Sequence, residues 1–347
     1  MQRSRVLRFV NNLNWSGFTK GISDMERRTI GKSKLTSGPL GLGCNRMIDA
    51  ENGDMISVAH NAIDKGMNQF DGADVYGFGK CEDFLGKVLK QRRDETTIVS
   101  KFGMVRTPEG QASVNVRPDY VRQACDASLK RLNMDHIDLY YQHRMDLSVP
   151  IEETVGAMAD LVKAGKIRAL GLCNTTPELI RRAHKVHPIA AVQMEYSLME
   201  RGVEKDVLPT CQKLGITFVA YGPLTYAFLA GEVKTRADLP PNDQFRSRMT
   251  RFTDDNLSHN VRMLATINKV ADEVDATPAQ VALAWCLHRP WDVLPIPGSS
   301  KPKHLRENIG AAGIKLSDAQ VKLLDKTFTP EKVKGAGAQM APMRSQV

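Results

Sequence analysis

Short apolar runs alternate with amphipathic stretches along most of this chain of 347 residues. Between the runs, apolar residues recur at helical spacing, as in Tyr120–Leu132 and Ile151–Gly165. A strand followed by a helix, repeated eight times, predicts an α/β fold in which parallel strands close into a single (β/α)8 TIM barrel. A doubly wound sheet with fewer strands is the alternative. The eight runs are Leu40–Cys44, Met67–Phe70, Thr97–Ser100, Ile137–Gln142, Ile167–Cys173, Ala190–Met194, Thr217–Tyr221 and Val293–Ile296.

The two ends of the chain depart from this pattern. Residues 1–24 are rich in Arg and contain one acidic residue, Asp24, so we expect a poorly ordered N-terminal leader. We expect the barrel to span residues 25–330, with a β-hairpin at Arg27–Ser37 as its N-terminal cap, and residues 331–347 to form a C-terminal tail. Cytoplasmic localisation is the expectation, and a mitochondrial location is the alternative if residues 1–24 are a presequence.

Three segments are too long and irregular to be plain connections: residues 103–117, 225–253 and 329–347. On a parallel barrel, the loops that follow the C-terminal ends of the strands carry the chemistry. We therefore expect these long loops at the C-terminal face to shape a binding site.

Charge and cysteine usage exclude several classes of protein. The net charge is +9, but the basic residues are dispersed and not interleaved with aromatic residues, so we expect no nucleic-acid partner. No apolar stretch approaches the 18 or so residues of a membrane-spanning helix, so we expect no membrane partner. The nearest cysteines, Cys44 and Cys81, are 37 residues apart, and no His-Glu-x-x-His motif occurs, so we expect no metal site.

Four residues suited to acid–base chemistry follow three of the runs. Asp71 and Tyr76 come after the second run, Lys101 after the third and His143 after the fourth. Taken singly, an Asp–Lys pair or a buried His is most often structural. A barrel, however, gathers all its strand ends around one pocket, where the four side chains would meet.

Together these side chains suit proton donation to a carbonyl oxygen. A free Tyr is a weak acid near neutral pH, and a neighbouring Lys ammonium lowers the pKa of its hydroxyl. Asp71 would keep Lys101 charged, and His143 would orient the substrate carbonyl. No nucleophile motif such as Gly-x-Ser-x-Gly is present, so carbonyl reduction with hydride from a cofactor is the favoured reaction.

Residues that could hold such a cofactor follow the later runs. Tyr221 offers a ring to stack on a nicotinamide, and Asn174 and Gln193 could bind its carboxamide. The turn at residues 298–300 precedes a helix and presents backbone N–H groups to a phosphate. The positive charge of Lys301, Lys303 and His304 favours a 2′-phosphate, and therefore NADPH over NADH.

The motifs of residues 26–324 resemble those of the aldo–keto reductase superfamily, in particular its bacterial, fungal and plant branch of perakine-reductase-like enzymes. The resemblance is carried by Gly41-Leu-Gly-Cys44, Phe70-Asp-Gly-Ala-Asp-Val-Tyr-Gly77, Ser100-Lys-Phe-Gly103, Ser128-Leu-Lys-Arg-Leu132, Asp138-Leu-Tyr-Tyr-Gln-His-Arg144, Gly165-Lys-Ile-Arg-Ala-Leu-Gly-Leu172, Val192-Gln-Met-Glu-Tyr-Ser-Leu198, Thr277-Pro-Ala-Gln-Val-Ala-Leu-Ala-Trp285 and Ile296-Pro-Gly298.

The resemblance implies reduction of aldehydes and ketones to alcohols with NADPH by direct hydride transfer. Tyr76 would be the general acid, Asp71 and Lys101 its tuning pair, and His143 the orienting residue. A non-catalytic, cofactor-binding subunit like those of potassium channels is the alternative, and we expect a monomer or small homo-oligomer. The positions that would bind NADPH or NADP+ are Cys173, Asn174, Gln193, Tyr221, Gly222, Leu224, Gly298, Ser300, Lys301, His304, Glu307 and Asn308.

Two departures from the family pattern fall close to these positions. Cys173 stands where the family often has Ser, which could cost one carboxamide hydrogen bond. Thr225, Tyr226 and Ala227 replace a usual Gly-x-Gly, and Tyr226 could either narrow the cofactor tunnel or line the substrate pocket.

Overall fold

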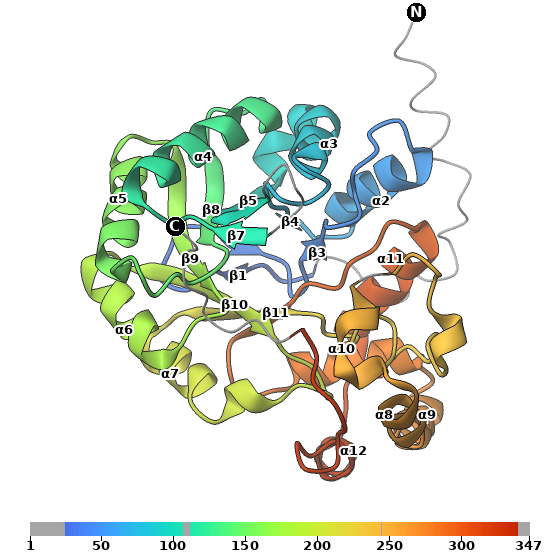
Figure 1. Ribbon diagram of the computed structural model, residues 1–347. Helices are drawn as coiled ribbons and strands as arrows, with labels where there is room; N and C mark the ends of the chain where they lie inside the picture. The colour runs from blue at the N-terminus through green and yellow to red at the C-terminus, as the bar shows by residue number, and fades with distance from the viewer. Residues whose placement is uncertain (1–24, 107–111, 244, 339–347) are drawn as a thin grey trace, which may run out of the picture.

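The computed structural model describes residues 25–106, 112–243 and 245–338, and it contains one sheet of eight strands. Neighbouring strands are parallel, and their spatial order follows the chain. Figure 1 shows them at the centre of a ring of helices. The strands are β3 (Leu42–Gly43), β4 (Gln69–Asp71), β5 (Thr97–Phe102), β8 (Ile137–Gln142), β9 (Ile167–Cys173), β10 (Ile189–Glu195), β11 (Thr217–Tyr221) and β12 (Val293–Pro295).

Backbone hydrogen bonds join the first and last strands and close the barrel. The N–H of Gly41 donates to the Pro295 carbonyl at 3.0 Å, and the N–H of Gly43 donates to the Pro297 carbonyl at 3.2 Å. A parallel bridge between Gly43 and Gly298 continues this seam. The predicted (β/α)8 barrel is therefore confirmed, and the doubly wound alternative is wrong, because that sheet has two open edges.

The closing seam leaves no room for a side chain at position 43. A Cβ added to Gly43 would lie 2.9 Å from the Ile296 carbonyl oxygen, which is backbone and cannot rotate away. We expect Gly43→Ala to destabilise the protein by about 1–3 kcal/mol, the usual cost of overpacking. Gly53→Ala is the matched control, because nothing lies within 4 Å of its added Cβ. Equal midpoints of urea unfolding for the two variants would contradict this expectation, because they would show that the backbone at the seam shifts to accommodate the added methyl group.

Helices follow the strands and pack on the outside of the barrel (Figure 1). Those that follow strands directly in the chain are α2 (Gly53–Asp64), α3 (Lys80–Leu89), α4 (Pro118–Leu132), α5 (Ile151–Lys163), α6 (Pro177–Val186), α7 (Val207–Leu214) and α11 (Pro302–Gly310). The chain between β11 and β12 holds α8 (Asp254–Val261), α9 (Leu264–Glu273) and α10 (Pro278–Leu287), and α12 (Asp318–Thr327) comes last. The Thr277 hydroxyl caps the start of α10 by accepting a hydrogen bond from the Gln280 N–H.

The predicted hairpin caps the N-terminal end of the barrel. It consists of β1 (Arg28–Thr29) and β2 (Thr36–Ser37), and Ile30 between them is fully buried against the side chains of the barrel interior. The N–H of Gly31 donates to the hydroxyl of Thr217, the first residue of β11, at 2.7 Å. With this end plugged, a ligand can reach the interior from the C-terminal face.

The long loops contain structure that the sequence did not predict. The segment 103–117 includes a short antiparallel pair, β6 (Met104–Arg106) and β7 (Ala112–Val114). The segment 225–253 forms isolated 3-10 turns. The predicted leader at residues 1–24 lies outside the described residues. No helix in the described part of the chain is long and apolar enough to cross a membrane, and all six cysteines are buried and free.

The described part of the C-terminal tail crosses the C-terminal face. The Ala336 carbonyl accepts a hydrogen bond from the N–H of Arg251 at 3.1 Å. The N–H of Ala338 donates to Oε2 of Glu195, the last residue of β10, at 2.9 Å. The tail is thus held beside the strand ends that carry the candidate site.

Candidate active site

The four predicted acid–base residues lie together at the C-terminal end of the barrel. Asp71 ends β4, Lys101 is the penultimate residue of β5, and His143 directly follows β8. Tyr76 lies in the turn between β4 and α3. The ends of β4, β5 and β8 each place one polar side chain at this end of the barrel, and the turn after β4 places Tyr76 beside them.

Lys101 is the centre of this group. Its ammonium forms an ion pair with Asp71 and donates to the Gly72 carbonyl at 2.8 Å. It also donates to Oη of Tyr76 at 3.4 Å. The Tyr76 ring meets the His143 ring edge-on, with centroids 5.9 Å apart and an interplanar angle of 85°. The four side chains therefore form one contiguous cluster.

Burial and neighbouring charges have opposite effects on the pKa values of Lys101 and Tyr76. Lys101 is 0% exposed, and burial, the largest single effect, favours the neutral amine. The charge of Asp71, the hydrogen bond it accepts from the ammonium and the neighbouring Tyr76 and Cys173 together outweigh burial and raise the pKa of Lys101 above its usual value. Burial raises the pKa of Tyr76 to about 12, and the lowering effect of Lys101 offsets this only in part. The sequence argument expected a net lowering, because it could not weigh the loss of hydration. The hydroxyl of Tyr76 is thus protonated at neutral pH.

His143 is neutral in this environment. Burial, followed by the positive charges of Lys101 and Arg144, lowers the pKa of its imidazole well below the ordinary value. Its Nδ1 has no hydrogen-bond partner among the described residues. A neutral imidazole can donate or accept a hydrogen bond, as the placement of a polar ligand requires.

The predicted nicotinamide-binding residues bond to one another and to the acid–base cluster. The Tyr221 hydroxyl donates to Oδ1 of Asn174 at 2.9 Å, and Nδ2 of Asn174 donates to the His143 carbonyl at 3.4 Å. Nε2 of Gln193 donates to Oδ2 of Asp71 at 2.6 Å. The sequence did not predict that Gln193 holds Asp71. Cys173, the last residue of β9, is buried, and burial raises the pKa of its thiol.

The predicted phosphate-binding turn lies at the closing seam, on the same end of the barrel. Lys301 is the N-cap of α11, and its side chain forms no capping hydrogen bond to the first N–H groups of the helix. Nδ2 of Asn308 is buried with no hydrogen-bond partner in the described part of the chain. Nδ1 of His304 lies 3.7 Å from Glu232 and 3.9 Å from Glu307, so His304 has acidic neighbours that the sequence argument left out. Ser300 is partly buried and Lys301 is exposed in the same turn.

These donors fit a dinucleotide. Helix N–H groups without a side-chain cap favour an anion such as a phosphate. A buried amide with no protein partner is uncommon and is accounted for by a polar ligand. Gly298 has no side chain and is exposed, which leaves the backbone accessible next to these groups.

The chain segment after β11 is strained. Thr225, Tyr226 and Ala227 all have left-handed backbones, with φ of 47°, 54° and 77°. Side chains with a Cβ disfavour this conformation, by about 1–2 kcal/mol each. A Cβ added to Gly222 would lie 3.4 Å from the Tyr226 ring, so the ring covers the predicted pyrophosphate stretch. Its hydroxyl is buried with no partner among the described residues, which leaves it available to a ligand.

Two further charged groups, Glu195 and Arg144, lie at the C-terminal end of the barrel and were not predicted as site residues from the sequence. Burial raises the pKa of Glu195 to about 7, despite the nearby charge of Arg251. Arg144 follows His143 directly, and its Nε and Nη1 are buried without hydrogen-bond partners among the described residues. The position of Arg144 immediately after a strand was the sequence signal that could have identified it.

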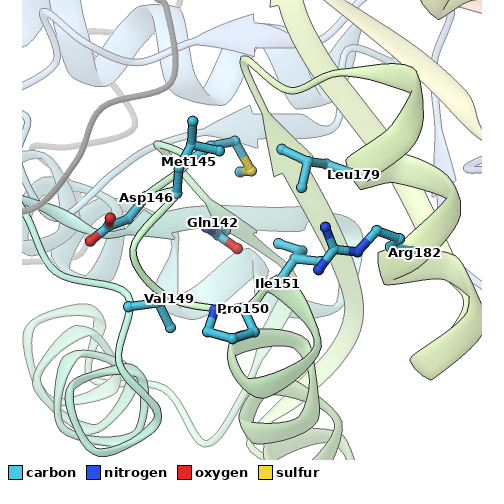
Figure 2. Close-up of a pocket in the computed structure, with 9 residues that line it drawn as sticks. Gln142, Met145, Asp146, Val149, Pro150, Ile151, Leu179 and Arg182 are labelled. Carbon is cyan, nitrogen blue, oxygen red and sulfur yellow. The ribbon is translucent and has the colours of Figure 1, made fainter.

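A small cavity of about 60 Å³ lies behind the loop that carries His143. Figure 2 shows Gln142 pointing into it, with Met145 and Leu179 on one side and Val149, Pro150 and Ile151 on the other. None of the four acid–base residues lines this cavity. Since side chains alternate along a strand, Gln142 faces away from the barrel interior that Tyr141 occupies.

Comparison with known proteins assigns the chain to a family. The model of the Aldo/keto reductase family matches residues 39–328. The chain belongs to the aldo/keto reductase family. A relative from Glycine max, described as probable aldo-keto reductase 1, is 43% identical over 299 residues, which cover 84% of this chain and 86% of the relative.

Solved structures of reductases share the fold of this aldo/keto reductase. The glycerol dehydrogenase AKR11B4 from Gluconobacter oxydans is 29% identical with a TM-score of 0.79, over 88% of this chain and 96% of the other. The thermostable aldo-keto reductase Tm1743, solved with the inhibitor epalrestat, is 31% identical with a TM-score of 0.71, over 87% and 100%. Membership of the family makes the protein an oxidoreductase that acts on small carbonyl compounds with a nicotinamide cofactor.

Proposed function

We propose that the protein reduces aldehydes and ketones to alcohols with NADPH, and that Tyr76 is the general acid. The observation that carries the proposal is the buried ammonium of Lys101, which contacts both the carboxylate of Asp71 and the hydroxyl of Tyr76. A structural ion pair needs no hydroxyl beside it, whereas general acid catalysis needs a positioned proton donor, and the Tyr76 hydroxyl can serve as one.

The four acid–base residues supply the proton to the carbonyl oxygen of the substrate and hold that oxygen in place. The Tyr76 hydroxyl donates its proton to the oxygen, and the adjacent ammonium of Lys101 stabilises the phenolate that remains. Asp71, held by Gln193, keeps Lys101 charged and in place. His143, being neutral, forms a hydrogen bond to the carbonyl oxygen and orients it towards Tyr76. When bound, the reduced cofactor supplies the hydride that the carbonyl carbon receives.

The cofactor would lie between the two groups of donors at this end of the barrel. Tyr221, Asn174 and Cys173 would hold the nicotinamide, and Gln193 would add to this contact through its place beside Asp71. Gly222 and Leu224 would receive the pyrophosphate. Gly298, Ser300, Lys301, His304, Glu307 and Asn308 would hold the adenosine and its phosphate.

Turnover of NADPH in the presence and absence of carbonyl compounds tests the proposal. We expect the absorbance of NADPH to fall only when an aldehyde or ketone is present. A protein that binds NADPH tightly but does not oxidise it with any member of a broad carbonyl panel would instead be a cofactor-binding regulatory subunit.

The choice of NADPH over NADH is expected to depend on the start of α11. Lys301→Ala combined with His304→Ala should raise the Kd for NADPH at least about tenfold, because the Lys301 ammonium and the His304 imidazole that would bind the 2′-phosphate are lost. The Kd for NADH should change less than about twofold. The matched control is Lys315→Ala, because Lys315 is a basic residue that lies beyond the end of α11. This variant should leave both Kd values unchanged. Equal losses for both cofactors would show that the 2′-phosphate is not bound at this helix.

A further inference from the structure

We propose that the carbonyl substrates carry a carboxylate group, and that the guanidinium of Arg144 binds it. This inference rests on the proposed function and adds the class of substrate. The compounds it favours are aldehydes and ketones with a carboxylate elsewhere in the molecule, and those it disfavours are the neutral esters of the same compounds.

The guanidinium of Arg144 has no acidic partner in the described part of the chain. The side chain is only partly exposed, and its Nε and Nη1 are buried without a hydrogen-bond partner there. Burial lowers the pKa of Arg144, and the only groups that counteract this effect are Tyr221 and Cys173, neither of which is a carboxylate. A guanidinium stays protonated in proteins, and a charge removed from water is normally paired. Arg144 therefore lacks the anion that its charge requires.

Other arginines that are buried or partly buried in this protein have such an anion. Ion pairs with an Asp or Glu carboxylate are formed by Arg28, Arg92, Arg93, Arg131, Arg182, Arg201, Arg246, Arg251 and Arg289. The fold thus supplies a carboxylate where an arginine serves the structure. The unpaired guanidinium of Arg144 is accounted for by a ligand that brings its own carboxylate.

Arg144 lies beside the residues proposed to hold the reacting groups. The peptide bond between His143 and Arg144 is held in place, because its carbonyl accepts a hydrogen bond from Nδ2 of Asn174 at 3.4 Å, and Oδ1 of Asn174 accepts one from Tyr221. The charge of Arg144 affects the pKa values of His143, Cys173 and Tyr221. Cys173 and Tyr221 belong to or pack on the interior of the barrel. The guanidinium therefore lies by the opening of the barrel, next to the proposed carbonyl site.

The phosphates of the cofactor do not account for the unpaired charge. Arg144 comes after β8, whereas the proposed phosphate-binding turn comes after β12. These two strands are four positions apart in a closed ring of eight, so they lie on opposite sides of the barrel. A substrate between Tyr76 and His143, in contrast, would lie next to Arg144.

The charges in the cluster favour a carboxylate over a phosphate. Lys101, the cation of the acid–base cluster, is already paired with Asp71, so Arg144 contributes one unpaired positive charge. A phosphate monoester carries nearly two negative charges near neutral pH, and a carboxylate carries one. The planar guanidinium also matches a carboxylate through two parallel hydrogen bonds. One carboxylate per substrate is the match for both the charge and the shape.

The test compares 4-oxobutanoate with its methyl ester as substrates for the full chain with NADPH. The two aldehydes share their carbon chain up to the carboxyl group and differ in charge. We expect kcat/KM to be at least about tenfold higher for the acid, since a hydrogen bond between charged groups contributes this much to binding. Arg144→Met should lower the ratio of the two values at least about tenfold, through the KM for the acid. Effects of the variant on steps that both substrates share cancel in this ratio.

Two further variants serve as controls. Arg144→Lys keeps the charge but not the planar fork, so it should restore part of the ratio. Arg262→Met removes an exposed positive charge between α8 and α9, and it should leave the ratio unchanged. Urea unfolding should show Arg144→Met to be no less stable than the unmodified chain, because no ion pair is lost.

A binding measurement separates this inference from the proposed function. In calorimetric titrations with 4-hydroxybutanoate, Arg144→Met should weaken binding at least about tenfold relative to the unmodified chain and to Arg262→Met. The affinity for butane-1,4-diol, which lacks the carboxylate, should change less than about twofold. If NADPH is oxidised with neither aldehyde, the proposed function is wrong, while the titrations still decide the carboxylate contact.

Three results would overturn the inference. The first is an equal kcat/KM for the acid and the ester in the unmodified chain. The second is an affinity for 4-hydroxybutanoate that does not change in Arg144→Met. The third is a rise in the Kd for NADPH in Arg144→Met with an unchanged ratio of acid to ester, because the anion held by Arg144 would then belong to the cofactor.

Discussion

Replacement of Tyr76 by phenylalanine is expected to abolish carbonyl reduction. The variant retains the ring that packs against His143 but loses the hydroxyl that contacts Lys101. Removal of a general acid costs about 10²–10⁴ in kcat. Because the hydroxyl donates only when the carbonyl oxygen develops charge, the Kd for NADPH should change less than about twofold. Stopped-flow or steady-state oxidation of NADPH and an equilibrium titration of the cofactor measure the two quantities.

The control for this variant is Tyr140→Phe. Tyr140 lies one strand position from Tyr141, is fully buried, and stacks on Phe102 at 5.0 Å outside the barrel interior. It should therefore keep full activity. Turnover of Tyr76→Phe within tenfold of the unmodified protein would contradict the assignment of Tyr76 as the acid.

Replacement of Lys101 by methionine is expected to have a large effect on both stability and activity. Methionine fills a similar volume, but Asp71 would keep only the hydrogen bond from Gln193 inside a buried site. Loss of one partner of a buried ion pair costs about 3–5 kcal/mol. Activity should fall at least about 100-fold, because the phenolate of Tyr76 would lose its neighbouring charge. Urea unfolding and NADPH oxidation measure the two effects.

The double variant Asp71→Asn with Lys101→Met separates the two roles. Without the buried carboxylate, much of the lost stability should return, since the remaining groups are neutral. Activity should stay low, because the charge next to Tyr76 is still missing. Recovery of activity together with stability would mean that the ion pair serves only the fold.

The fold could be predicted from the order of its elements, and so could the position of the cluster. The eight apolar runs correspond to the eight strands, and residues that follow a strand directly, such as Asp71 and His143, reach the expected pocket. Tyr76 lies five residues beyond Asp71, and the turn after β4 places its hydroxyl next to the ammonium of Lys101. These features are local in the chain, which is why the sequence predicts them.

Features that depend on distant contacts could not be predicted. The bond from Gln193 to Asp71 joins residues that are 122 positions apart. The pKa of Tyr76 depends on how fully its hydroxyl is removed from water, and neither the residue types nor their spacing shows this. The left-handed backbones of Thr225 and Ala227 arise where the family usually has glycine, so the residue types present in this chain do not indicate them.

The attachment of the tail next to Glu195 has a practical consequence for handling the protein. Ala338 lies at the mouth of the barrel, whereas Met25 lies by Gly66, just before β4, at the opposite end. An affinity tag or reporter domain joined to a chain shortened after Ala338 would start beside the opening through which reactants pass. The same fusion joined to a chain shortened to begin at Met25 would start on the closed side, so for shortened forms immobilisation is best done through Met25.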